Sequence, residues 1–136
     1  MTLLAGIMTA VLLALAALHI LWGIGFWWPI RDERRLVSAV IGVTNATRMP
    51  GPIPCALVAV ALIFAAVLLW FPPGLIRQLG LGVAAVAFMT RGFMAFRPIW
   101  ARLTAQEPFR SNDRRYYGPL CLALSAGFIL LFLKGF

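Results

Sequence analysis

The chain has 136 residues, of which 62% are hydrophobic and 12% charged, and its mean hydropathy is +0.94. A soluble domain of this size could not bury so much apolar surface, so the composition excludes an ordinary soluble protein and predicts one membrane domain over residues 1–136. The formal charge of +8 arises from residues that flank apolar runs, which favours membrane lipids as partners and argues against nucleic acid.

The first apolar run predicts a membrane-spanning helix over residues 3–28, ended by Pro29 and by a charged segment at 31–35. The beginning of this run resembles the hydrophobic part of a secretion signal. However, no Lys or Arg precedes it and no small-residue cleavage site follows it. We therefore expect a membrane helix that is retained.

A short amphipathic helix is predicted after the first span. One helical face of this segment is apolar, with Thr44 at its end, and arginines flank it. The face is formed by Leu36, Val37, Val40, Ile41 and Thr44, and the flanking residues are Arg34, Arg35 and Arg48. This pattern predicts a helix that lies on the membrane surface.

Three further spans are predicted over residues 53–71, 75–96 and 117–133. Each must be helical, because a lone segment in lipid has to satisfy its own backbone hydrogen bonds. The expected fold is all-α, with four transmembrane helices in an antiparallel bundle and the short interfacial helix between the first two. The link over residues 97–116 is polar and basic, and we expect Trp100 and Phe109 to anchor it at the membrane interface.

The arginines predict the orientation of the chain in the membrane. The first and third loops hold Arg31, Arg34, Arg35, Arg48, Arg97, Arg102, Arg110, Arg114 and Arg115, whereas the other side holds Arg77 and Lys134. Short loops rich in Lys and Arg remain in the cytoplasm. We therefore expect a multi-pass protein with both termini outside.

Polar side chains inside the predicted spans permit two interpretations. Such residues are costly in lipid and often mark functional sites. One interpretation is a cavity open to the cytoplasm and lined by His19, Trp22, Arg91 and Tyr117. The other is structural: His19 donates a hydrogen bond to a carbonyl of a neighbouring helix, and Arg91 extends to lipid phosphate.

The sequence offers little support for a metal, a cofactor or catalysis. There is a single histidine, and the two cysteines form no metal-binding motif, so we expect no metal, no cofactor and two inert thiols. No nucleophile motif is present. The acidic residues are all expected in loops, which leaves no paired carboxylates in the spans; they are Asp32, Glu33, Glu107 and Asp113.

Two stretches of the sequence resemble a family of bacterial four-span membrane proteins, domain-of-unknown-function family 3995. The first is His19-Ile-Leu-Trp22-Gly-Ile-Gly25, followed by Trp28-Pro29. The second comprises Arg91-Gly-Phe93 and, after Phe96-Arg97, the run Asp113-Arg-Arg-Tyr-Tyr117-Gly-Pro119-Leu120-Cys121. The resemblance implies a bacterial cytoplasmic (inner) membrane location. It also groups His19, Trp22, Arg91, Asp113 and Tyr117 as one candidate ligand-binding set, and it implies no particular activity.

The chain departs from the family pattern at three positions. Leu21 stands where the family has an aromatic residue, and Phe26 replaces a glycine. Ala95 replaces an acidic residue, which would leave Arg91 without the partner that the family pattern implies.

Three hypotheses for the function follow. The favoured one is a non-enzymatic accessory or partner-binding component, part of a larger membrane protein complex or a homo-oligomer. The alternative is a protein that binds or modifies a lipid or isoprenoid in a cytoplasm-facing cavity. The least supported is a small oligomeric channel or transporter, because the predicted spans contain no carboxylate.

Overall fold

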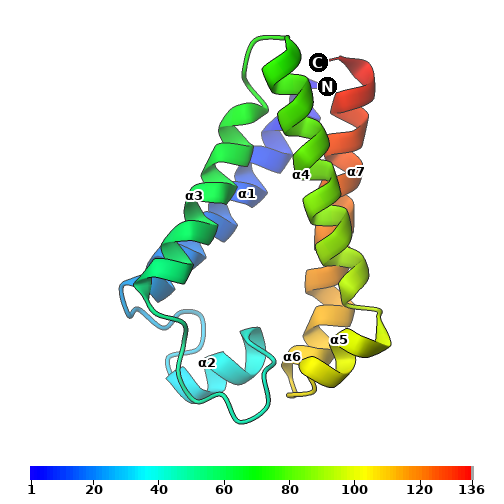
Figure 1. Ribbon diagram of the computed structural model, residues 1–136. Coiled ribbons are helices and arrows are strands. Elements are labelled where there is room, and N and C mark those ends of the chain that lie inside the picture. Colours follow the sequence, from blue (N-terminus) through cyan, green and yellow to red (C-terminus); the bar gives the residue numbers. More distant parts are fainter. Residues whose placement is uncertain (136) are drawn as a thin grey trace.

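The computed structural model describes residues 1–135, and this part of the chain is helical with no strand (Figure 1). The predicted all-α class is therefore confirmed. The elements are α1 (Thr2–Gly23), α2 (Glu33–Val40), α3 (Pro52–Leu68), α4 (Leu75–Met94), α5 (Pro98–Leu103), α6 (Phe109–Asn112), η1 (Asp113–Tyr117) and α7 (Gly118–Lys134).

The helix ends differ from the predicted spans where local backbone geometry intervenes. Helix α1 ends at Gly23 rather than near residue 28, and Gly25 beyond it has a φ of 85° that no right-handed helix contains. Helix α3 begins at Pro52, a position where the missing proline N–H has no helical partner to lose. The link predicted over residues 97–116 is largely helical, because α5, α6 and most of η1 lie within it.

Two helical segments are long and apolar enough to cross a membrane by length and composition. They are α1 and the continuous segment Phe109–Lys134, which comprises α6, η1 and α7. Helix α3 is apolar but has only 17 residues. Helix α4 has 20 residues and carries Arg77, Gln78 and Arg91, which lower its hydropathy.

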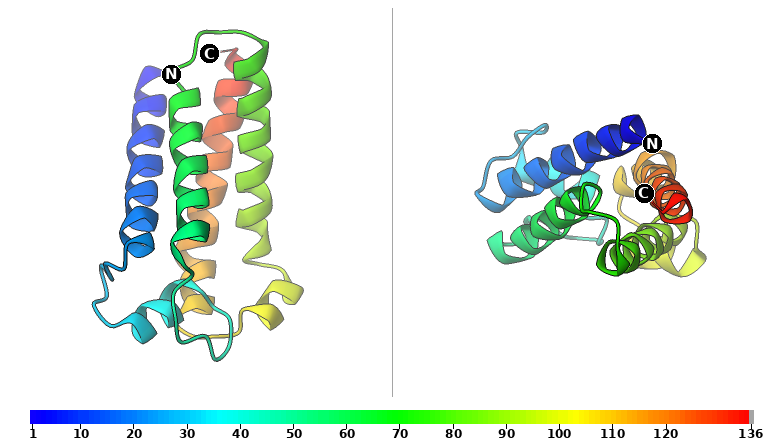
Figure 2. Two further views of the ribbon diagram at one scale, coloured as in Figure 1. Left: turned by 60° about the vertical axis from the view of Figure 1, so that its left-hand side comes forward. Right: turned by 90° about the horizontal axis from the view of Figure 1, so that it is seen from above.

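The long helices are arranged as two pairs. Helix α1 packs along α3, and α4 packs along α7, whereas few contacts join one pair to the other. The pairs approach each other at the end that holds both termini and diverge toward α2, α5 and α6 (Figures 1 and 2). All four helices therefore share contacts mainly at the terminal end.

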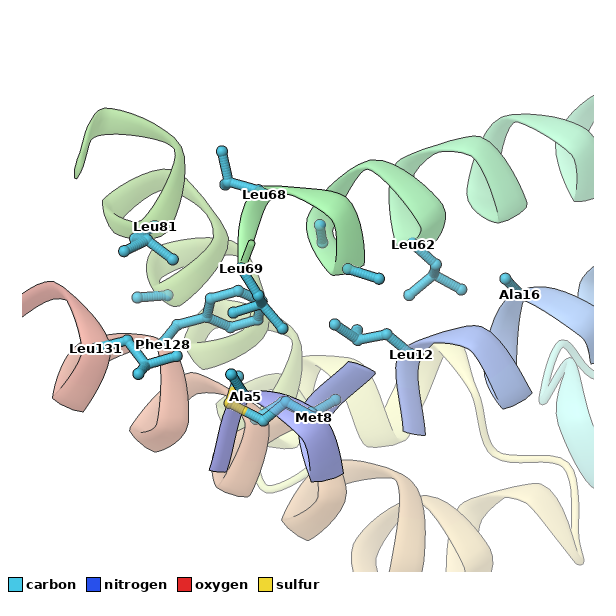
Figure 3. Close-up of a cluster of buried hydrophobic side chains, with 14 residues drawn as sticks. Ala5, Met8, Leu12, Ala16, Leu62, Leu68, Leu69, Leu81, Phe128 and Leu131 are labelled. Atoms are coloured by element: carbon cyan, nitrogen blue, oxygen red, sulfur yellow. The ribbon is translucent and has the colours of Figure 1, made fainter. Parts of the chain in front are cut away.

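The main hydrophobic core explains this shape. Phe128 and Leu131 of α7 lie with Met8 of α1 and Leu69, just after α3, and all four side chains are buried (Figure 3). Each helix contributes mainly its part toward the terminal end. The complete cluster is Ala5, Met8, Leu12, Ala16, Leu62, Ala65, Ala66, Leu68, Leu69, Leu81, Ala85, Leu124, Phe128 and Leu131.

Helix α2 forms where the amphipathic pattern predicted a helix. The Asp32 carboxylate caps it by accepting hydrogen bonds from the backbone N–H groups of Arg34 and Arg35. Its apolar residues Leu36 and Val37 are buried within the protein. The apolar face is therefore covered by the chain itself, which differs from a helix that inserts this face into lipid.

Candidate functional site

The structure places the five predicted site residues in two groups. His19 and Trp22 lie near the end of α1, where it faces α3. Arg91 of α4 lies with Asp113 and Tyr117 of η1 on the other helix pair. Within residues 1–135, no hydrogen bond or ring contact joins one group to the other.

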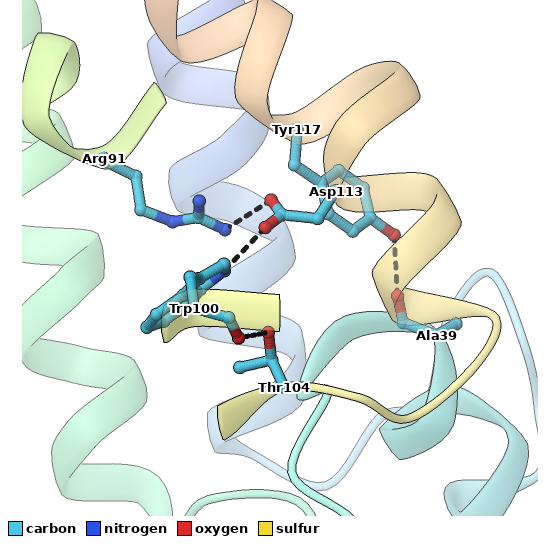
Figure 4. A network of polar contacts seen from close by, with 6 residues as sticks. All are labelled: Ala39, Arg91, Trp100, Thr104, Asp113 and Tyr117. Atoms are coloured by element: carbon cyan, nitrogen blue, oxygen red, sulfur yellow. Dashed lines mark hydrogen bonds and ion pairs between the residues drawn. The ribbon is translucent and has the colours of Figure 1, made fainter. Parts of the chain in front are cut away.

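Asp113 is the centre of the second group. Its side chain is 2% exposed, and its two carboxylate oxygens accept from different helices (Figure 4). Arg91 Nη2 donates to Oδ1 at 2.7 Å, and Trp100 Nε1 of α5 donates to Oδ2 at 2.8 Å. The Arg91 guanidinium also lies over the Trp100 ring, 5.4 Å from its centroid. The carboxylate therefore joins α4, α5 and η1.

Local sequence accounts for the position of Asp113. It begins a π-helical turn, which is wider than an α-helical one. Pro119 follows closely, and a proline cannot donate to the carbonyl four residues earlier and clashes with it in a regular α-helix. The wider turn accommodates the proline, so that α6, η1 and α7 continue as one helical segment.

Two sequence-based expectations are corrected here. Asp113 was expected in a loop, but it lies buried in η1. Arg91 was expected to lack a partner because of Ala95, or else to extend to lipid phosphate, but Asp113 neutralises it. Trp100 was expected at the membrane interface, which remains a prediction, and the structure adds that its indole N–H binds Asp113. The sequence did contain one signal for the contact between Trp100 and Asp113, because a buried indole N–H needs a hydrogen-bond acceptor.

Tyr117 and Phe109 connect this group to α2. Tyr117 Oη donates to the carbonyl of Ala39 at 2.9 Å, and the backbone N–H of Gln106 donates to the carbonyl of Gly42 at 3.1 Å. The Phe109 ring is 3% exposed and lies against Gly42. We call these contacts the α2–η1 clasp, because they join the two helix pairs at the end where the pairs diverge. Phe109 is thus buried rather than a membrane anchor.

His19 and Trp22 lie together on α1, with ring centroids 5.1 Å apart. His19 Nδ1 is 2.7 Å from the carbonyl oxygen of Leu15, one turn earlier on the same helix. The predicted partner was a carbonyl of a neighbouring helix, so that expectation is corrected. Trp22 Nε1 donates to the carbonyl of Trp28 at 2.7 Å.

Both residues line a pocket of about 150 Å³ between α1, α3 and the end of α2. The remaining lining is mainly aliphatic and is supplied by Val40, Ile41, Pro50, Pro54, Cys55 and Val58. A larger groove of about 500 Å³ lies along α4 beside Phe132, and none of the five predicted residues lines it. The pocket at His19 thus contains two of the four residues predicted to line one cavity, whereas Arg91 and Tyr117 lie outside it.

The acidic side chains are all engaged in local structure. Asp32 caps α2, and Glu33 accepts from the backbone N–H of Met49 at 3.0 Å. Glu107 accepts from the backbone N–H of Ser111 at 3.2 Å, and Asp113 is held by Arg91 and Trp100. In the described part of the chain, no three His, Cys, Asp or Glu side chains gather where they could hold a metal ion.

The arginines of the loops have a different environment. All nine are exposed, and none forms an ion pair with another residue of the range 1–135. They belong to α2, α5, α6, η1 and the adjoining loops, at the end of the molecule opposite the two termini (Figure 1). They are Arg31, Arg34, Arg35, Arg48, Arg97, Arg102, Arg110, Arg114 and Arg115.

Comparison with known protein families identifies the family of this chain. The model of the family described as "Protein of unknown function (DUF3995)" matches residues 12–128, which include every predicted site residue. No curated protein and no solved structure matches the chain.

Proposed function

This chain belongs to the DUF3995 family, as the sequence motifs predicted, and we propose that it is a four-span protein of the bacterial cytoplasmic membrane. In this proposal α1, α3, α4 and α7 cross the bilayer. The nine exposed arginines face the cytoplasm, where the positive-inside rule and anionic lipids favour them, and both termini lie outside.

The dimensions and surfaces of α3 and α4 support four spans. Their 17 and 20 residues correspond to about 26 and 30 Å of helix, close to the thickness of the hydrocarbon core. The outer face of α4 is apolar and exposed, including Leu79, Val83 and Val86. Of its arginines, Arg91 is neutralised by Asp113, and Arg77 donates to the carbonyl of Leu69 at 3.2 Å. Both arginines of α4 therefore have hydrogen-bond partners within the protein, which lowers the cost of placing α4 in lipid.

We propose that the role of the protein is non-enzymatic, as an accessory or partner-binding component of the membrane. One observation carries this proposal: all four acidic side chains hold the fold together, and the one carboxylate next to the spans is buried between Arg91 and Trp100. A general base or nucleophile needs access to a substrate, and Asp113 has none.

The proposed role is tested by deleting the gene and purifying the protein from its native membrane in a mild detergent. We expect native mass spectrometry to show a stoichiometric protein partner or a defined homo-oligomer. We also expect the deletion strain to lose no small-molecule product. A missing product that the purified wild-type protein restores in vitro would contradict the proposal.

Lipid binding is the second candidate function, and the exposed arginines favour it. Nine guanidinium groups lie at one end of the molecule, and none has a carboxylate partner within residues 1–135, so they are free to bind the phosphates of anionic lipids. We expect phosphatidylglycerol to bind in preference to phosphatidylcholine in native mass spectrometry. Replacing Arg114 and Arg115 by Gln should weaken this preference, whereas replacing Lys134, at the opposite end, by Gln should not. Equal binding of phosphatidylglycerol and phosphatidylcholine by the wild type would contradict the lipid-binding role.

A further inference from the structure

The hydrogen bond of His19 fixes how its ring can interact with a ligand. A carbonyl oxygen only accepts, so the 2.7 Å contact with Leu15 requires the proton on Nδ1. In the neutral ring, Nε2 then carries a lone pair and acts as an acceptor. Among the residues that the structure describes, none donates to Nε2.

The other polar side chains that line the pocket are already engaged. The only donor of Trp22 is bound to Trp28, and Cys55 Sγ contacts the carbonyl of Pro50 at 3.9 Å. The remaining side chains of the lining are aliphatic. Among the side chains that line the pocket, His19 therefore offers a ligand the one nitrogen acceptor without a partner in the described part of the chain, its Nε2 atom, beside a mainly apolar surface.

We propose that this pocket binds the hydroxyl end of an aliphatic alcohol, with the hydroxyl donating to His19 Nε2. A cavity of about 150 Å³ holds about six carbon atoms, as a benzene-binding cavity of that size shows. The pocket thus suits the last few carbons of a chain rather than a whole lipid. The inference goes beyond the lipid-binding role proposed above, because that role concerns the exposed arginines and this one concerns a separate pocket.

The position of the pocket fits an alcohol that lies in the membrane. His19 is four residues before the end of α1, about 6 Å along the helix axis, on the side that carries the arginines. This depth lies near the boundary between hydrocarbon and headgroups, where lipid hydroxyl groups reside. The shared chemistry is an alcohol on an aliphatic chain, and its source is either a long-chain lipid alcohol or a short free alcohol.

The test uses the full chain in phosphatidylcholine nanodiscs, because this lipid has no hydroxyl donor. His19 is the only histidine, so ¹⁵N and ¹³C labelling of histidine reports on this ring alone. We expect ¹⁵N shifts that place the proton on Nδ1. We also expect nuclear Overhauser contacts between the His19 ring and the CH₂OH group of 1-dodecanol. Dodecyl methyl ether, which lacks the donor, should bind about three- to tenfold more weakly, as expected for one lost hydrogen bond.

Two variants of α3 control for position. Val58 lines the pocket, so the larger side chain of Val58→Phe should fill part of it and abolish the contacts with dodecanol. Val60 is exposed on the same helix and does not line the pocket, so Val60→Phe should retain these contacts. Equal contacts from 1-butanol would identify a short alcohol as the ligand, and contacts from dodecanol alone a lipid alcohol. A proton on Nε2, no contacts, or equal binding of alcohol and ether would overturn the inference. The preference for phosphatidylglycerol is measured separately, so failure of this inference would leave the proposed lipid binding by the arginines intact.

Discussion

Replacing Asp113 by leucine should lower the free energy of unfolding by about 2–4 kcal/mol. The substitution leaves the Trp100 indole N–H without an acceptor and Arg91 without its counter-charge. The loss is smaller than for a fully buried ion pair, because the Arg91 side chain is 36% exposed and can be solvated in part. Unfolding by SDS in dodecyl maltoside micelles, followed by circular dichroism, measures the change.

Two further variants separate the charge from the hydrogen bonds. Asp113→Asn keeps an acceptor for Trp100 and should be less destabilising than Asp113→Leu. Adding Arg91→Leu to Asp113→Leu should restore part of the stability, because no unneutralised charge then remains. If the double variant is as unstable as the sum of the two single variants, Asp113 does not act through Arg91.

Replacing Gly42 by alanine should lower the free energy of unfolding by about 2–4 kcal/mol, from backbone strain and overpacking together. Gly42 has a φ of 77°, which disfavours any residue with a Cβ. A Cβ there would also overlap Cδ1 of the Phe109 ring. Because Phe109 is buried on the other helix pair, the substitution should open the α2–η1 clasp. The same SDS titration measures the effect.

Gly25→Ala is the matched control for the second prediction. Gly25 has a similar φ of 85°, but a Cβ at this position would meet nothing within 4 Å. Gly25→Ala should therefore lower the free energy of unfolding by the backbone strain alone, about 1–2 kcal/mol. Combining Gly42→Ala with Phe109→Ala should remove the overlap, and a double variant with no recovery would argue against the clasp.

The helices could be predicted from the sequence because each depends on local signals. Apolar runs, flanking prolines and one amphipathic stretch were enough to locate α1, α2, α3, α4 and α7. The end of α1 was placed too late, since Phe26 and Trp28 are apolar and hydropathy does not register the left-handed backbone at Gly25. The helical nature of α6 and η1 was also missed, because their polar residues resemble a loop.

The candidate site was less predictable, because its contacts join distant segments. Arg91 and Asp113 are 22 residues apart, and Tyr117 and Ala39 are 78 apart. Motif resemblance grouped His19 with Arg91, but hydropathy cannot tell which helices pair. The pairing of α1 with α3 and of α4 with α7 instead separates them. The hydrogen bond from Trp100 to Asp113 was missed, because a tryptophan in a basic link is also typical of a membrane interface.

The arrangement of the long helices in two pairs has a consequence for biosynthesis. Each pair is continuous in sequence, with α1 and α3 before Pro72-Pro73 and α4 and α7 after it. In the proposed four-span arrangement, the first pair can therefore assemble as a helical hairpin in the membrane before the second pair has left the ribosome. The α2–η1 clasp, which needs Tyr117, can close only when the second hairpin arrives. If the proposed four-span arrangement holds, two separately translated fragments, divided between Pro72 and Pro73, should accordingly recombine in the membrane into the complete fold.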